Sequence, residues 1–198
     1  MGNRVSALLL AAGSSSRMGR TKQLLLLDDK PVIRHCIDAL FAAKVVNIVV
    51  VVSTADNGIT EALSGLPVTV AVNTTPGSDM AESVRTGFRA LDHSSSAILV
   101  CLSDHPLVSP LSIMALMDMH NRFPDKIIIP CYQGRRGHPG LFPRTVLDEI
   151  FSGSTLRDIV RKESGRVLEL PGLDEGVLFD MDTRDDYERL VELFGRKK

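Results

Sequence analysis

Residues 5–22 read V-S-A-L-L-L-A-A-G-S-S-S-R-M-G-R-T-K, an apolar run that passes directly into a Gly/Ser-rich loop. The run at 5–10 predicts a buried strand, and the loop ends in two spaced cations, Arg17 and Lys22. Small residues let backbone N–H groups approach an anion closely, and Arg and Lys add charge-assisted contacts to phosphate. The stretch therefore predicts a strand that leads into a triphosphate-binding loop.

This loop matches neither of the common phosphate-binding motifs. A Walker loop has the form G-x-x-x-x-G-K-[ST], but Gly13 and Gly19 are one residue too far apart, and Lys22 lies three residues beyond Gly19. The G-x-G-x-x-G fingerprint is absent, which counts against a nicotinamide-dependent dehydrogenase. A solvated surface loop is the alternative interpretation, because Gly/Ser-rich connections are common.

Working outward from this stretch, apolar runs alternate with helical stretches up to residue 130. The predicted strands lie at 5–10, 48–52, 68–72, 97–102 and 126–130. They are rich in Val, Ile and Leu with little polar alternation, as expected for strands covered on both faces. Helices are predicted at 32–43, 56–64, 80–91 and 111–122. This alternation predicts an α/β fold, a three-layer α/β/α sandwich around a mostly parallel, Rossmann-like sheet.

The pattern changes after Pro130. Residues 131–142 are rich in Gly, Arg and Pro, and we expect an excursion from the sheet there, such as a hairpin. Short helices are predicted at 145–151 and 156–162, a strand at 167–169 and a final helix at 185–194. No internal repeat or linker divides the chain, so residues 1–198 are predicted to form a single domain.

Composition narrows the class of protein. The 198 residues are 44% hydrophobic and 24% charged, with a net charge of -1, so no strong field favours nucleic acid or an acidic membrane. No apolar run is long enough to cross a bilayer, and no secretory signal pattern opens the chain, so we expect a cytoplasmic location. Cys36, Cys101 and Cys131 form no C-x-x-C pair, which argues against a zinc site or a disulfide scaffold.

Polar residues follow several predicted strands, at the sheet edge where such folds bind ligands. Asp104 closes the strand at 97–102, and Asp180 and Asp182 are two apart, so they share a face in an extended segment. Carboxylates of this kind suit Mg²⁺ held against substrate phosphates. The alternative is structural: Asp104 could form a turn, and Asp182 or Thr183 could cap the last helix.

Two further positions leave alternatives open. His138 could bind an acceptor or act as a general acid or base, although a lone histidine is more often structural. The other four histidines suggest no role. Asp79 either tunes the choice of nucleotide or caps the helix that follows it.

Five segments together resemble one family. These are L-A-A-G-S-S-S-R-M-G-R-T-K at 10–22, G-S-D-M-A-E-S-V-R-T-G at 77–87, S-D-H-P-L-V-S-P at 103–110, R-G-H-P at 136–139 and D-M-D-T at 180–183. The chain resembles the molybdenum cofactor cytidylyltransferase family, within the MobA-like nucleotidyltransferase superfamily. That resemblance implies a fold of the nucleotide-diphospho-sugar transferase type.

The resemblance also implies roles for individual residues. It implies that Arg17, Lys22 and Asp104 are catalytic and that Asp104 and Asp182, helped by Asp180, hold Mg²⁺. Nucleotide contacts are implied for Leu10, Ala11, Ala12, Gly13, Arg17, Lys22, Ser83 and Gly87, and acceptor contacts for Arg136, Gly137, His138 and Pro139. Relatives that transfer guanylyl groups usually carry Gly at the position of Ala12, so the expected nucleotide is CTP.

The implied reaction is transfer of CMP from CTP to the phosphate of a molybdopterin-type cofactor, with release of pyrophosphate. A client molybdoenzyme is a possible partner for the product. Two alternatives stay open: a nucleotidyltransferase acting on a sugar or polyol phosphate, and a non-catalytic protein that binds and delivers a cofactor.

Overall fold

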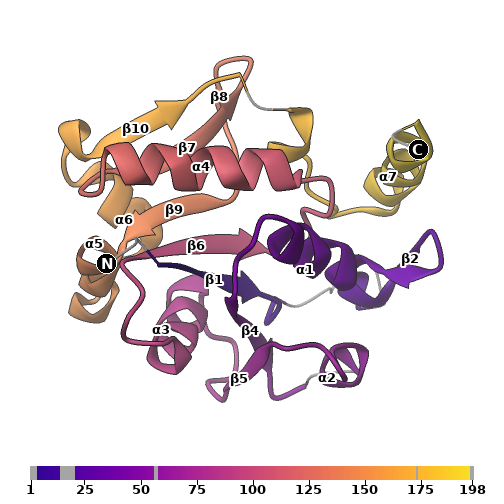
Figure 1. Ribbon diagram of the computed structural model, residues 1–198. Coiled ribbons are helices and arrows are strands. Elements are labelled where there is room, and N and C mark those ends of the chain that lie inside the picture. Colours follow the sequence, from indigo (N-terminus) through magenta and orange to yellow (C-terminus); the bar gives the residue numbers. More distant parts are fainter. Residues whose placement is uncertain (1–3, 14–20, 56–57, 173, 197–198) are drawn as a thin grey trace.

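The computed structural model describes residues 4–13, 21–55, 58–172 and 174–196 (Figure 1). Within these ranges an eight-stranded sheet has the order β10-β7-β9-β6-β1-β4-β5, and β8 pairs with β7. The strands are β1 (Val5–Leu10), β4 (Asn47–Ser53), β5 (Thr69–Asn73), β6 (Ala97–Leu102), β7 (Ile127–Tyr132), β8 (Arg135–Arg136), β9 (Gly140–Pro143) and β10 (Val167–Leu170). A separate ribbon pairs β2 (Leu26–Leu27) with β3 (Lys30–Pro31).

Pairing in the sheet is parallel except where β8 and β9 enter it. β1 pairs in parallel with β4 and β6, β4 with β5, and β7 with β10. The prediction of a mostly parallel sheet is therefore confirmed. The excursion predicted for 131–142 is correct only in part. β7 and β8 do form a hairpin, but β9 lies inside the sheet, antiparallel to both β6 and β7.

The helices cover both faces of the sheet, which gives the predicted three layers. They are α1 (Val32–Ala42), α2 (Ile59–Ala62), α3 (Met80–Ala90), α4 (Pro110–Arg122), α5 (Arg144–Leu147), α6 (Leu156–Arg161) and α7 (Arg184–Arg196). Short 3-10 turns lie at Lys22–Leu24, Asp148–Ser152, Ser164–Arg166 and Glu175–Val177. The helix predicted at 145–151 is therefore α5 followed by a 3-10 turn.

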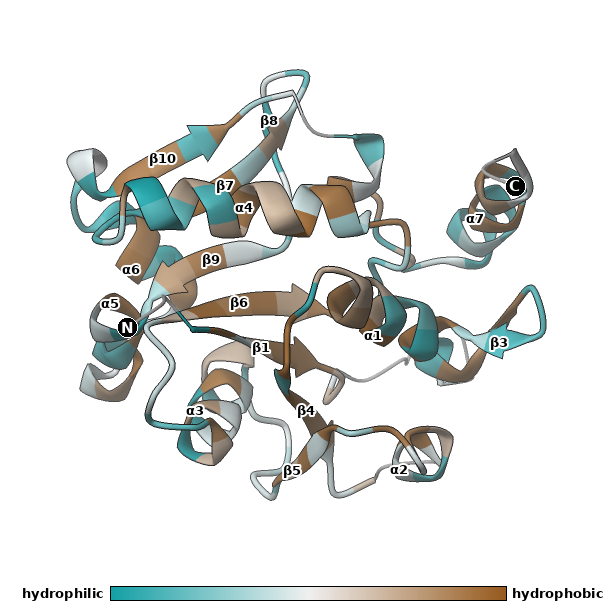
Figure 2. Cartoon of the chain, viewed as in Figure 1, coloured by the Kyte–Doolittle hydropathy of each residue, from teal (hydrophilic) through white to brown (hydrophobic). Residues whose placement is uncertain are grey.

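Two hydrophobic cores follow from the alternation of strand side chains. Leu9 and Val50 point to the face covered by α1 and α4, whereas Leu8 and Val51 point to the face covered by α3, α5 and α6. Figure 2 shows the apolar strands enclosed between helices whose outer faces are more hydrophilic. Burial on both faces explains why these strands lack polar alternation.

A third cluster joins the last helix to the β2-β3 ribbon. Leu190 of α7 and Met181 before it pack with Leu27, Val32 and Leu107. No helix in the described ranges is both long and apolar enough to cross a membrane.

Candidate active site

One lysine joins three segments that are far apart in the sequence. Lys22 begins the 3-10 turn after the β1 loop, Asp104 follows β6, and Asp182 precedes α7. Lys22 Nζ lies 2.5 Å from Asp104 Oδ2 and 2.8 Å from Asp182 Oδ1. The Lys22 side chain is only 12% exposed. The fold therefore holds one cation between two carboxylates at the carboxyl edge of the sheet.

The charges of this cluster follow from its surroundings. Burial alone would lower the pKa of the Lys22 ammonium, but its hydrogen bonds to Asp104 and Asp182 outweigh burial and raise that pKa above its ordinary value. Asp104 Oδ1 is buried and has no hydrogen-bond partner among the described residues. An unpartnered buried carboxylate oxygen is costly in a folded protein, which suits an atom that waits for a ligand.

The first three side chains of the D-M-D-T segment at 180–183 alternate between more exposed and buried positions, as in an extended chain. Met181 is buried and its backbone N–H donates to the Asp104 carbonyl, while Asp180 is exposed. Thr183 and Asp186 cap α7 through reciprocal hydrogen bonds between their side chains and backbone N–H groups. The Asp182 carboxylate can therefore contact Lys22.

A cavity of about 200 Å³, open to solvent, adjoins this cluster. Its walls come from the β1 loop, the start of α3 and the end of β6. They are lined by Leu10, Ala12, Gly13, Lys22, Gln23, Ser78, Asp79, Met80, Ser83, Leu102, Ser103 and Asp104. The cavity therefore combines a cation, two carboxylates, small residues and hydroxyl groups.

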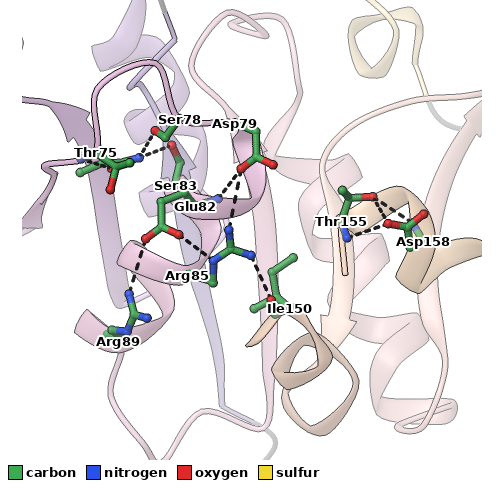
Figure 3. Close-up of polar contacts among 11 residues, drawn as sticks. Thr75, Ser78, Asp79, Glu82, Ser83, Arg85, Arg89, Ile150, Thr155 and Asp158 are labelled. Atoms are coloured by element: carbon green, nitrogen blue, oxygen red, sulfur yellow. Dashed lines mark hydrogen bonds and ion pairs between the residues drawn. The ribbon is translucent and has the colours of Figure 1, made fainter. Parts of the chain in front are cut away.

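The segment between β5 and α3 forms a polar wall of this cavity (Figure 3). Asn73, at the end of β5, donates through Nδ2 to Ser78 Oγ at 2.8 Å and to Ser83 Oγ at 3.1 Å. Asp79 caps α3 by accepting from the backbone N–H of Glu82 at 2.9 Å, and its Oδ1 lies 3.9 Å from Arg85 Nη2. Asp79 is thus a helix cap that also lines the cavity.

A small, mostly apolar pocket of about 20 Å³, enough for about one water molecule, lies beside the R-G-H-P segment. His138 and Pro139 line it together with His105 and residues of β6, α1 and α4. The rings of His105 and His138 meet edge to face, with centroids 5.2 Å apart. Burial lowers the pKa of both imidazoles, that of His138 to about 4, so both are neutral at neutral pH.

Gly137 and Arg136 have structural contacts of their own. A Cβ on Gly137 would lie 2.2 Å from the Val177 carbonyl oxygen, so only glycine fits there. Arg136 Nε donates to Glu169 Oε1 on β10 at 2.8 Å, and both side chains are about half exposed. The structure therefore brings His138 and Pro139 to the pocket and places Arg136 at the sheet edge.

Other predicted nucleotide contacts lie away from the cavity or outside the described ranges. Ala11 is buried and its N–H donates to Val51. Gly87 packs against the sheet, where a Cβ would lie 2.6 Å from Val51 Cγ2 and 2.8 Å from Leu8 Cδ2. The structure thus supports a packing role for Gly87, because its missing side chain lets α3 approach β1 and β4. Arg17 lies outside the described residues.

Two residues of the site have no role assigned from the sequence. Asn73 stands at the end of a predicted strand, and its burial and hydrogen bonds are seen only in the structure. His105 follows Asp104 directly, and its contact with His138 depends on the antiparallel placement of β9.

The fit of a divalent cation can be judged from the donors present. Among the described residues, no group of three or more His, Cys, Asp and Glu side chains is arranged to hold a metal ion. Asp104 and Asp182 nevertheless supply a pair of hard oxygen ligands, and Asp104 Oδ1 has no hydrogen-bond partner among the described residues, with His105 Nε2 3.9 Å away. Mg²⁺ commonly uses one or two carboxylates together with substrate phosphates. The donor set therefore fits Mg²⁺ that arrives with a nucleotide.

The chain is similar in sequence to known proteins, over all or part of its length. The nicotine blue oxidoreductase of Paenarthrobacter nicotinovorans is 27% identical over 200 residues, which cover 94% of this chain and 96% of that protein. The bifunctional enzyme IspD/IspF of Novosphingobium aromaticivorans is 33% identical over 99 residues, or 48% of this chain. The matched stretch spans only 25% of the length of that enzyme.

A solved structure is similar over the whole chain. A nucleotidyl transferase from Methanothermobacter thermautotroptrophicus (Mth528) superposes with a TM-score of 0.86 at 25% identity, covering 100% of both chains. The predicted nucleotide-diphospho-sugar transferase type of fold is confirmed by this likeness. The family model of the MobA-like NTP transferase domain matches residues 7–167. The chain therefore belongs to the MobA-like NTP transferase family.

Proposed function

We propose that this protein transfers CMP from CTP to the phosphate of a molybdopterin-type cofactor and releases pyrophosphate. The observation that carries the proposal is the contact of Lys22 with both Asp104 and Asp182 at the edge of a cavity walled by Gly13 and Ser83. A cation at the phosphate end of a polar cavity is what nucleotidyl transfer requires. Membership of the MobA-like NTP transferase family supports the same reaction class.

The chemistry needs positioning and charge stabilisation more than a strong base. An acceptor phosphate oxygen attacks the α-phosphorus of CTP, a new P–O bond forms, and the bond to the bridging oxygen of pyrophosphate breaks. Negative charge builds on the α-phosphoryl oxygens and on the leaving group. The Lys22 ammonium is placed to stabilise that charge, and Arg17 is proposed as a second cation. A phosphate monoester is already ionised at neutral pH, so Lys22 acts chiefly by orientation and electrostatics.

Mg²⁺ is proposed as the metal, held by Asp104 and Asp182 with the exposed Asp180 nearby in the sequence. When bound, it would neutralise charge on the phosphate oxygens. The protein's part is to fix the two carboxylates: Lys22 draws them together, and the backbone hydrogen bond from Met181 to the Asp104 carbonyl sets their spacing.

The acceptor is proposed to bind beside R-G-H-P. His138 follows the hairpin and contacts His105, which is the neighbour of Asp104, so the two segments meet next to the cation. Two neutral imidazoles offer flat, uncharged surfaces against which a heteroaromatic ring could stack at the mouth of this small pocket. CTP is favoured by Ala12, which lines the cavity where guanylyl-transferring relatives usually have glycine. A molybdoenzyme is the proposed recipient of the product.

The test is pyrophosphate release with Mg²⁺, comparing CTP, GTP, ATP and UTP, each with and without molybdenum cofactor. Release that needs both CTP and the cofactor supports the proposal. Release that needs a sugar or polyol phosphate would reassign the acceptor, and binding of CTP without release under any condition would favour a carrier. Lys22→Met should abolish turnover, while Lys30→Met, at a half-exposed lysine paired with Asp38, is the matched control.

A further inference from the structure

The polar wall between β5 and α3 has a fixed hydrogen-bonding direction. The Asn73 side chain is 3% exposed and makes three hydrogen bonds. Its Oδ1 accepts from the Thr75 backbone N–H at 3.0 Å. Because a backbone N–H can only donate, this bond identifies which end of the amide is oxygen. The Nδ2 group therefore faces Ser78 and Ser83, and both of its hydrogens are used there.

This arrangement determines whether the hydroxyl groups of Ser78 and Ser83 can donate or accept further hydrogen bonds. Each hydroxyl accepts a hydrogen bond from Asn73, so each keeps its own hydrogen for another partner. Among the described residues, neither hydroxyl donates to any group. Ser78 and Ser83 both line the cavity. The wall thus presents two hydroxyl donors that await acceptors.

The charges around the cavity indicate which part of a nucleotide meets this wall. Asp79 stands beside Ser78, and its carboxylate would repel phosphate. The phosphates belong instead near Lys22, at the part of the cavity formed by the β1 loop and β6. Met80, which also lines the cavity and is half exposed, offers an apolar surface for a flat ring. The neutral base of a nucleotide would therefore be expected against residues 78–83.

We propose that Asn73 is a positioning residue that makes Ser78 and Ser83 a donor pair, and so selects a base whose edge presents two adjacent acceptors. The proposal rests on the proposed function and extends it to the choice of base. Cytosine presents the acceptors O2 and N3 side by side. Uracil carries a hydrogen on N3, which would face a hydroxyl hydrogen. A site built to hydrogen-bond one edge rejects an analogue that leaves its polar groups unpaired.

The substitution Asn73→Asp reverses the direction of the hydrogen bonds to Ser78 and Ser83 with almost no change in the shape of the side chain. A carboxylate still accepts from the Thr75 N–H, but it also accepts from both serines, so their hydrogens turn away from the cavity. The affinities of CTP and UTP are measured by equilibrium binding to the full chain with Mg²⁺ and without acceptor. The ratio of the two affinities cancels the effect of the added charge, since both ligands are triphosphates. Asn121→Asp, at an exposed position of α4, is the matched charge control.

The expected result is a preference for CTP over UTP that falls about tenfold or more in Asn73→Asp and is unchanged in Asn121→Asp. Equal losses for both nucleotides, or an unchanged ratio, would overturn the positioning role. Ser83→Ala tests the same wall independently, and it should weaken CTP binding more than UTP binding. A native protein that binds UTP as tightly as CTP would overturn the inference while leaving nucleotidyl transfer to the separate pyrophosphate assay.

Discussion

Substituting Gly137 by alanine tests the close contact that holds the R-G-H-P segment in place. A Cβ at this position would lie 2.2 Å from the Val177 carbonyl oxygen, which also accepts the hydrogen bond from His138 N at 2.8 Å. Carbon and oxygen do not approach closer than about 3.2 Å without strain, so the backbone would have to move by about 1 Å. The movement would disturb the same carbonyl that anchors His138.

The cost can be bounded from these contacts. Overpacking costs about 1 to 3 kcal/mol, and weakening one backbone hydrogen bond adds about 1 kcal/mol. We therefore expect Gly137→Ala to lower the free energy of unfolding by about 2 to 4 kcal/mol. For a chain of this size the loss corresponds to a Tm lower by about 4 to 16 °C.

Differential scanning calorimetry measures this loss, and Gly165→Ala is the control. No atom lies within 4 Å of a Cβ built on Gly165, so that variant should stay within about 2 °C of the wild type. The affinity for CTP should change less than about twofold in Gly137→Ala, because Gly137 does not line the cavity next to Lys22 and Asp104. A Gly137→Ala protein with the same Tm as the Gly165→Ala control would refute the reasoning.

Three further predictions concern single positions. Gly87→Ala should lower stability by about 1 to 3 kcal/mol in urea unfolding and leave the affinity for CTP unchanged, because its Cβ would meet Val51 and not the cavity. Asp104→Asn should lower the rate of pyrophosphate release about 100-fold or more, since Lys22 loses a charged partner and a phosphate-site carboxylate is removed; full activity would exclude the role of Asp104. His120 is 1% exposed, neither ring nitrogen has a hydrogen-bond partner among the described residues, and burial lowers its pKa. Below a pH of about 6.5 this histidine takes up a proton in the unfolded chain but not in the native protein, so the free energy of unfolding decreases as the pH is lowered. Urea unfolding at pH 7.5 and 5.5 should show a smaller decrease in the free energy of unfolding for His120→Leu than for the wild type.

Most elements up to residue 122 could be predicted because strands and helices of this kind are specified by local sequence patterns. β1 and β6 have the predicted bounds, and β4, β5, α1, α3 and α4 begin and end within two residues of the prediction. Buried parallel strands need unbroken apolar runs, and the helices between them begin and end at capping and helix-breaking residues that can be recognised in the sequence. Helix α2 spans Ile59–Ala62 and is shorter than the predicted range 56–64, of which residues 56 and 57 lie outside the described residues.

The region after Pro130 was harder because its pairing is not local. β9 is four residues long, and only its neighbours across the sheet show that it is a strand. The same limit applies to the site. Asp104 and Asp182 could be chosen from their chemistry, but their shared contact with Lys22 depends on chain segments separated by as many as 160 residues. Gly87 was assigned to the nucleotide by its motif, whereas its packing against Leu8 and Val51 needs the fold.

The reversed strand β9 has a consequence for how this chain could diversify. Because β9 starts at Gly140 opposite Val100 and runs back along β6, the segment at 131–139 begins and ends at the same edge of the sheet. Insertions in the turn between β7 and β8 would leave the register of every parallel strand unchanged. Under the proposed function, changes in this one short segment would alter the acceptor site and leave the proposed nucleotide site unchanged.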